Sequence, residues 1–211
     1  MTVSYDTLLR DKLGGTTVGD ELWRAVTSVE AGDERAYGEA LLTIDRLSWR
    51  DFEDRYYETV SSRWANRMVG DSLLPGGALE TLFSDRRVHN NFRAALAAHQ
   101  NITETLARDA ARSRSSLVRV ALAGNPAISG DAVDVLRKSK SEEVIGYLLS
   151  NGGVDGETLR DLVEHARRIG MGEYIIASDG CKNPSMPVDV VLEWASGDDT
   201  LRPCVLGSPV L

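Results

Sequence analysis

The chain has 211 residues, a net charge of −8, and 42% hydrophobic but only 6% aromatic residues. Such a chain is long enough to bury a helical core built from Ala, Leu and Val. Its acidic balance opposes general nucleic-acid binding, because phosphate groups are held by Lys and Arg. No run approaches the roughly 18–20 apolar residues of a membrane span, and Met1–Lys12 lacks the apolar segment of a signal peptide. We therefore expect a cytoplasmic protein that does not enter a membrane.

The N-terminal segment, residues 1–64, predicts a small helical cap. Helices are expected to begin at Asp20, Asp33 and Ser48, each with apolar residues that share one face. Two interpretations of the aromatic residues stay open: a buried core of the cap, or an exposed surface for a partner, since Trp and Tyr are common interface anchors. The residues concerned are Trp23, Trp49, Tyr56, Tyr57 and Trp64.

Residues 65–211 repeat the same apolar pattern, while the residues between the apolar positions change freely. Equivalent positions 26 residues apart are Leu96, Leu122 and Leu148; Ile102, Ile128 and Val154; and the polar column His99, Asn125 and Asn151. A fixed period of this size is typical of a solenoid, in which each unit buries its apolar face against the next one.

One copy of the repeat predicts two short helices. Pro126 has no backbone N–H and disfavours the helical region for Asn125, so the first helix must end there. Ser129 to Asp131 can begin the second helix, with a negative charge near its N-terminus. Val133 and Leu136 then lie on one face of that helix.

We count five copies and a final half copy. The upstream copy places Met68, Leu74, Leu79 and Leu82 two periods plus two residues before the central one. The downstream copy contains Ile176, Asn183-Pro184, Met186, Val191 and Trp194, and it is longer around Ser178–Lys182. Glycines at 170, 172 and 180 predict a protruding loop there. This loop is either a spacer without function or part of the face that solenoids often use for binding. The half copy, residues 202–211, ends without a second helix.

The copy at residues 117–140 resembles the leucine-rich repeat variant family, a bacterial relative of the HEAT and armadillo solenoids. The residues that match are Val118-Arg119, Ala121–Ala123, Asn125-Pro126, Val133 and Leu136, and looser copies extend the resemblance over about residues 66–211. The resemblance implies an all-α fold: a right-handed α-solenoid, an ARM/HEAT-like superhelix of about five helical repeats over residues 65–211, behind the cap of residues 1–64. Some members hold an iron–sulfur cluster on clustered cysteines, which this chain lacks, so we expect no cofactor.

Positive charge gathers between residues 86 and 119, where Glu104 and Asp109 oppose seven Arg residues. Arg93, Arg119 and Arg202 share one column of the repeat. This column is either structural, bonding carbonyls or an acid, or a basic strip that grips an acidic partner or a phosphate backbone. The candidate partner-binding residues are Arg86, Arg87, Arg93, Arg112, Arg119 and Arg202.

The sequence offers no recognisable catalytic constellation. No G-x-S-x-G is present, and no G-K-[ST] follows Gly152-Gly153. His165, beside Glu164 in the middle of a helix, is expected to be exposed. Cys181 and Cys204 are expected to be reduced thiols, and a count of two Cys and three scattered His argues against a structural zinc site. We therefore expect no enzyme, no catalytic residue and no metal.

The sequence thus favours a non-catalytic scaffold that binds a protein or peptide on a solenoid surface. One alternative is a HEAT-like nucleic-acid-binding protein, similar to DNA glycosylases of this architecture, that uses the Arg86–Arg119 strip. Another is an acidic phage or defence-related protein that binds a host protein. The half copy adds a possible homodimer through its open end, at Val205, Leu206, Val210 and Leu211.

Overall fold

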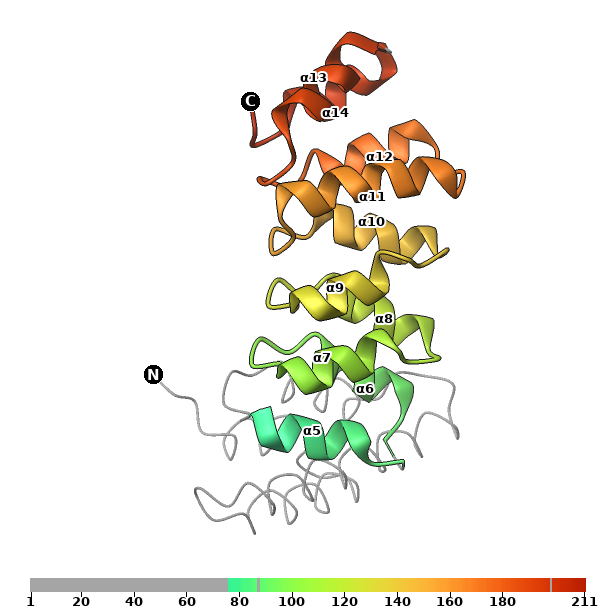
Figure 1. Ribbon diagram of the computed structural model, residues 1–211, viewed down its shortest axis with the longest axis vertical. Helices are drawn as coiled ribbons and strands as arrows, with labels where there is room; N and C mark the ends of the chain where they lie inside the picture. Colours follow the sequence, from blue (N-terminus) through green and yellow to red (C-terminus); the bar gives the residue numbers. More distant parts are fainter. Residues whose placement is uncertain (1–75, 87, 198) are drawn as a thin grey trace, which may run out of the picture. The chain divides into compact units, whose positions relative to one another are not determined.

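The computed structural model describes residues 76–86, 88–197 and 199–211 (Figure 1). The predicted cap of residues 1–64, the predicted boundary after residue 64, and Met68 and Leu74 lie outside these residues. Every regular element of the described part is helical, which confirms the all-α class. The helices are α5 (Gly76–Ser84), α6 (Asn90–Ala97), α7 (Glu104–Ala111), α8 (Ser116–Ala123), α9 (Gly130–Leu136), α10 (Glu142–Ser150), α11 (Gly156–Arg168), α12 (Glu173–Gly180), α13 (Val188–Gly197), the short 3₁₀ helix η1 (Asp199–Leu201) and α14 (Arg202–Leu206).

The chain divides into two compact units between Thr103 and Glu104. In the described part of the first unit, α5 packs against α6. Leu79 and Leu82 of α5 and Phe92 and Leu96 of α6 are buried, because each helix turns one apolar face inward.

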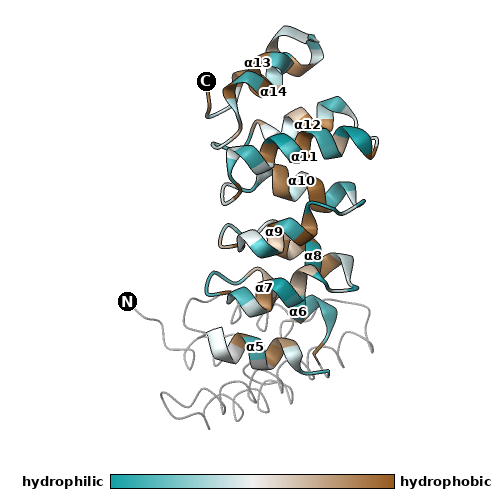
Figure 2. Ribbon diagram, viewed as in Figure 1, coloured by the Kyte–Doolittle hydropathy of each residue, from teal (hydrophilic) through white to brown (hydrophobic). Residues whose placement is uncertain are grey.

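The second unit, residues 104–211, is built from pairs of short helices. α8 packs against α10 and α10 against α12, while α7 packs against α9. Within a pair, α8 contacts α9 and α10 contacts α11, and α7 contacts α8 of the following pair. Apolar and polar residues alternate along these helices (Figure 2), as expected where each helix has one buried face.

The apolar positions that repeat in the sequence are buried in the structure. Leu122 and Leu148 are fully buried near the ends of α8 and α10, and Leu96 is fully buried at the same place in α6. Val133 and Leu136 in α9 have their counterparts in Leu159 and Leu162 of α11, and all four are buried. Equivalent sequence positions therefore have the same burial in consecutive helix pairs.

The polar column contains buried asparagines that join consecutive pairs. The Asn151 amide donates to the carbonyls of Ala123 (2.7 Å) and Asn125 (2.9 Å) in the preceding pair. The Asn183 amide donates in the same way to Leu149 (3.1 Å) and Asn151 (2.7 Å). An Asn side chain suits this place because it carries two donor hydrogens and an acceptor. We call this arrangement, centred on Asn125, Asn151 and Asn183, the asparagine ladder.

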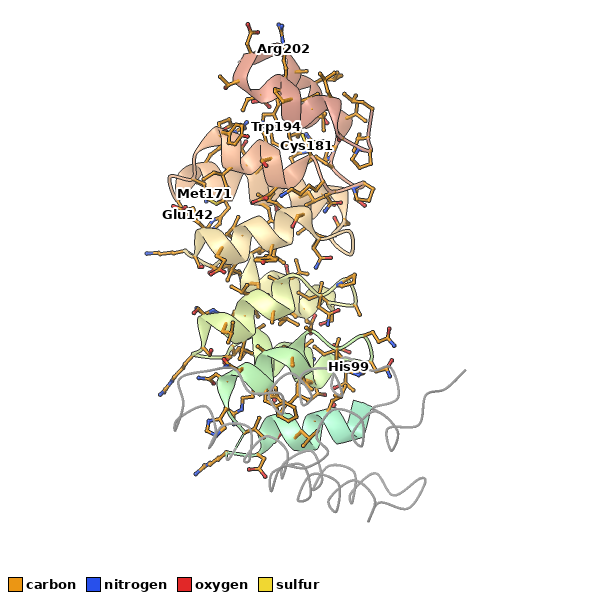
Figure 3. All side chains as sticks on the ribbon, turned by 180° about the vertical axis from the view of Figure 1, so that it is seen from behind. His99, Glu142, Met171, Cys181, Trp194 and Arg202 are labelled. Carbon is orange, nitrogen blue, oxygen red and sulfur yellow. The ribbon has the colours of Figure 1, made fainter. Side chains whose placement is uncertain are left out.

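The acceptor oxygen of each ladder asparagine forms the turn after its helix. Asn125, Asn151 and Asn183 each accept, at 2.9 Å, the backbone N–H two residues later. His99 accepts through Nδ1 from Asn101 N–H (3.0 Å), and Ser208 accepts through its hydroxyl from Val210 N–H (3.3 Å). Both are buried, so a different side chain supplies the same acceptor at each end of the column (Figure 3 labels His99).

The predicted protruding loop around Ser178–Lys182 is wrong. Residues 173–180 form α12, and Cys181 is buried directly after it. Gly180 lies against the core: a Cβ there would meet Met186 Cε and Trp194 Cη2, each at 2.8 Å. The prediction failed because it aligned Ile176 with Leu148, whereas the asparagine ladder aligns Asn183 with Asn151 and so Ile176 with Val144, which is equally buried.

The extra residues of this copy lengthen α11 instead. Asn151 and Asn183 are 32 residues apart, six more than the period of 26. α11 has 13 residues where α9 has seven, which accounts for all six. Gly170 ends the extension with φ +88°, a left-handed conformation that favours glycine. The extension, residues 163–168, carries Glu164, His165 and Arg167.

The described residues include neither a membrane-spanning helix nor a metal-binding cluster. In the part of the chain that the structure covers, every helix is too short or too polar to cross a bilayer. The same residues contain no group of three or more His, Cys, Asp or Glu side chains placed to hold a metal ion. Cys181 and Cys204 are free thiols, and burial raises the pKa of Cys181 to about 11.

Candidate interaction surface

Two arginines of the predicted column hold the loops that precede their own helices. Arg93 donates through Nη2 to the Asp85 carbonyl (2.8 Å), and its guanidinium lies 5.8 Å from the centre of the Phe83 ring. Arg119 donates through Nη1 to the Ser113 carbonyl (2.6 Å). Both side chains are half-buried. Their guanidinium groups bind backbone carbonyls and do not form an open basic strip.

The other predicted residues lie apart from these contacts. Arg202 is exposed and forms an ion pair with Asp199 (2.9 Å). Arg86 and Arg112 are exposed in the turns after α5 and α7. Arg87 lies outside the described residues. Within the second unit, Arg112, Arg119 and Arg202 thus have three different environments, and the structure does not assemble them into one site.

Where the repeat lacks its arginine, a histidine holds the loop. The position in α10 that corresponds to Arg119 is Ile145, which is fully buried. The carbonyl of Ser139, equivalent to that of Ser113, is instead contacted by His165 Nε2 at 2.8 Å. The prediction that His165 is exposed is wrong: it is half-buried, because the six-residue extension of α11 brings it back onto the α9–α10 loop.

We predict that His165→Ala lowers the free energy of unfolding by about 1 kcal/mol, because the Ser139 carbonyl loses its side-chain partner. Urea denaturation would measure this change. Arg168→Ala is the matched control on the same exposed end of α11, where Arg168 only bonds the Glu164 carbonyl of its own helix. The control should lie within about 0.5 kcal/mol of the wild type, and equal effects of the two substitutions would contradict this role of His165.

Ion pairs link the second helices of consecutive pairs. Arg108 pairs with Asp131 (3.3 Å), and Arg137 pairs with Asp161 (3.1 Å). Further along, Arg160 pairs with Asp189 and Arg167 with Glu193 (2.9 Å). The charges on this face are therefore largely neutralised within the molecule, and each exposed pair adds at most about 1 kcal/mol to stability.

Arg167 is the centre of a larger network that joins α11, α12 and α13. Its guanidinium contacts Glu164 (3.0 Å), Glu173 (2.7 Å) and Glu193 (2.9 Å). The Trp194 indole N–H also donates to Glu173 (2.7 Å). The bond from Arg167 holds the pKa of Glu173 below its usual value, against the opposing effect of burial, and the same pairing raises the pKa of Arg167.

The network predicts a stability contribution that disappears in acid. A carboxyl whose pKa is lower in the folded state stabilises the fold above its unfolded pKa, here near 4.5, and loses this effect as the pH falls through the folded value. Glu173→Gln should therefore be less stable than the wild type at neutral pH, with a gap that closes on acidification below about pH 4. Urea titrations at several pH values would measure it, and a gap that is constant with pH would contradict the assignment.

A hollow with a volume of about 390 Å³ lies between α10 and α12 in the second unit. We call it the α10–α12 hollow. It forms where Gly146 lets α12 approach: a Cβ on Gly146 would lie 2.7 Å from Asp179 Oδ2. Asp179 is neutralised by Lys182 (2.8 Å). The lining residues are Glu142, Glu143, Gly146, Tyr147, Ser150, Ile175, Asp179 and Lys182.

This hollow combines exposed apolar groups with unneutralised acids. Tyr147 and Ile175 are 47% and 45% exposed, although each is a large hydrophobic residue. Tyr147 rests on α8, where a Cβ at Gly124 would be 3.1 Å from its ring. Glu142 and Glu143 are exposed and form no ion pair with the described residues. The hollow can therefore accept an apolar side chain beside a positive charge.

Sequence reasoning did not select these residues. Tyr147 occupies the position of Ala121 in the preceding copy, and a large aromatic residue in place of a small one was the available signal. The role of Gly146 could not be seen, because it depends on how closely Asp179 of α12 approaches, and the sequence alignment of α12 was wrong.

No model of a protein family matches the chain, and none of the curated proteins or solved structures compared with it matches either.

Proposed function

We propose that the chain is a non-catalytic scaffold that binds a segment of a partner protein in the α10–α12 hollow. The observation that carries this proposal is the exposure of Tyr147 and Ile175 beside two carboxylates, Glu142 and Glu143, that form no ion pair with any described residue. Tyr is frequent among the residues that dominate binding energy at protein interfaces. An exposed aromatic ring held against a glycine loses little conformational freedom on binding, which favours affinity.

The proposal includes the architecture. We propose a right-handed α-solenoid of about five leucine-rich-repeat-variant or HEAT-like units, capped at its N-terminal end. The asparagine ladder supports this, because Asn151 and Asn183 make the same two inter-pair hydrogen bonds in consecutive pairs. Stacked units of this kind present extended surfaces to protein partners.

The expected occupant is a segment with an apolar side chain next to Lys or Arg. The apolar side chain would cover Tyr147 and Ile175, and the cation would face Glu142 and Glu143. The nucleic-acid alternative has weaker support, because Arg93 and Arg119 donate to backbone carbonyls and Arg202 pairs with Asp199. The homodimer stays a proposal: Leu206 and Leu211 are strongly exposed at the C-terminal end, while Val205 is buried.

The experiment is selection of peptides from a random library on the purified full chain, followed by affinity measurements. Selected peptides should combine an apolar residue with a nearby Lys or Arg. Tyr147→Ala, which introduces the residue found at the equivalent position 121 of the preceding copy, should lower the affinity for these peptides at least about tenfold. Glu142→Gln with Glu143→Gln should weaken them in a salt-dependent way.

Matched controls come from the other face of the unit. Leu192→Ala removes a similarly exposed apolar side chain from α13, and Glu157→Gln removes an exposed carboxylate from α11. Both controls should leave the affinity within about twofold. Selected peptides without a basic residue, or equal losses in the controls, would refute the proposal.

A further inference from the structure

Four cations of the second unit have no ion-pair or side-chain hydrogen-bond partner among the residues that the structure describes, and these four lie close together. Of the twelve Lys and Arg residues between 104 and 211, eight form an ion pair or a hydrogen bond: Arg108, Arg119, Arg137, Arg160, Arg167, Arg168, Lys182 and Arg202. Among the described residues, the remaining four are Arg112, Arg114, Lys138 and Lys140, and all four are exposed.

These four cations occupy equivalent places in two consecutive loops. Arg112 and Lys138 are 26 residues apart, as are Arg114 and Lys140, so each loop reads basic–Ser–basic–Ser. α7 packs on α9 and α8 on α10, which brings the α7–α8 and α9–α10 loops to the same edge of the unit (the right-hand edge in Figure 1). We call this edge, defined by the four cations, the basic edge.

The two loops are fixed in the same conformation. Ser113 accepts through Oγ from Ser115 N–H (3.2 Å), and Ser139 accepts likewise from Ser141 N–H (3.1 Å). The carbonyls of the same two serines are held by Arg119 and His165. The backbone that carries the four cations is therefore already ordered before any partner binds, which lowers the entropic cost of binding.

We propose that the basic edge is a second binding surface, one that takes an acidic segment of a partner protein. The basic edge is positively charged, whereas the α10–α12 hollow is negatively charged, so the two surfaces bind different segments. Four unneutralised cations on an otherwise acidic chain attract carboxylates and steer their approach. The proposal does not depend on the hollow being occupied.

Neighbouring acids favour a protein segment over a nucleic acid. Asp109 lies one helical turn before Arg112, and Glu142 and Glu143 follow Lys140 after a single residue, Ser141. A nucleic-acid backbone carries charge at close, regular intervals along its whole length, so it would meet these carboxylates wherever it crossed the edge. A protein segment carries discrete carboxylates that can face the four cations and leave the acidic neighbours uncovered.

The test uses the full chain and a fluorescein-labelled oligo-glutamate peptide, with a single-stranded DNA of similar charge as the competing probe. Fluorescence anisotropy should show binding of the peptide at low salt, tighter than binding of the DNA, with an affinity that falls between about 50 and 200 mM salt. Replacing all four cations by Ser should lower the affinity for the peptide at least about tenfold.

The matched control removes the same number of charges from cations that already form an ion pair or a hydrogen bond, through Arg108→Ser, Arg160→Ser, Arg168→Ser and Arg202→Ser. This control should retain peptide binding within about twofold. Should the fourfold loop variant fail to fold by circular dichroism, the two-residue variants of each loop give the same test, each with a partial loss. Absence of peptide binding at low salt, tighter binding of the DNA, or an equal loss in the control variant would overturn the proposal.

Discussion

Asn151→Ala is expected to lower the free energy of unfolding by about 3 kcal/mol or more, one of the largest effects of a single substitution in this chain. The side chain is buried and makes three hydrogen bonds, to the carbonyls of Ala123 and Asn125 and from the N–H of Gly153. Its removal leaves these backbone groups without their partner, and a buried unsatisfied group costs about 1–3 kcal/mol. Urea denaturation followed by circular dichroism would measure the change.

Asn151→Asp separates the contribution of the two donated hydrogen bonds from that of the accepted one. An ionised aspartate keeps the acceptor for Gly153 but turns a carboxylate toward two carbonyl oxygens, so it should destabilise at least as much as alanine does. Ser150→Ala is the neighbouring control, because this exposed hydroxyl only bonds Tyr147 of its own helix. A loss of less than about 1 kcal/mol for Asn151→Ala would show that the asparagine ladder does not join the helix pairs.

Leu122→Ala is expected to lower the free energy of unfolding by about 2–5 kcal/mol, as other truncations of buried leucines do. Leu122 is fully buried near the end of α8, and removal of its side chain leaves a cavity between neighbouring helices. Leu117→Ala is the matched control on the same helix, because Leu117 is 46% exposed. The control should cost much less, and thermal or chemical denaturation of the two variants compares them directly.

A small effect of Leu122→Ala, below about 0.5 kcal/mol, would mean that the apolar column of the repeat is not the core of the unit. The same substitution at Leu148, the next position of the column, provides a second measurement at an equally buried site. Similar losses at both positions are expected, since the two leucines occupy the same place in consecutive helix pairs.

The helical class and the buried positions could be predicted from the periodic apolar residues, because a helix that packs by one face needs an apolar residue at each contact. Leu96, Leu122 and Leu148 are fully buried as their spacing indicates. Pro126 and the neighbouring asparagine also marked the end of α8 correctly. The all-helical class follows from this local chemistry.

The place of the insertion could not be predicted, because apolar spacing alone allows more than one alignment. Ile176 is buried and could be matched with either Leu148 or Val144, and only the hydrogen bonds of Asn183 decide between them. The extension of α11 then determines the position of His165 and Arg167. Neither position could be predicted, because the sequence pattern placed the extra residues after residue 178 and not in α11.

The candidate sites were harder to predict than the fold. Sequence reasoning identified the charge reversal around Arg112 but could not tell which arginines are used internally, since a guanidinium that bonds a carbonyl looks the same in sequence as a free one. It also missed Lys138 and Lys140, because the negative charges of Asp131 and Asp134 cancel theirs in the local net charge. Tyr147 became a candidate only once its exposure was known.

The asparagine ladder is the central claim, because it is what makes consecutive helix pairs equivalent. Hydrogen exchange of side-chain amides, followed by NMR, tests it most directly. The Asn151 and Asn183 amides are buried and bonded, so their hydrogens should exchange far more slowly than those of the exposed Asn90 and Asn91 in α6. Exchange of the Asn151 and Asn183 amides as fast as that of Asn91 would contradict the ladder and, with it, the proposed stack of units.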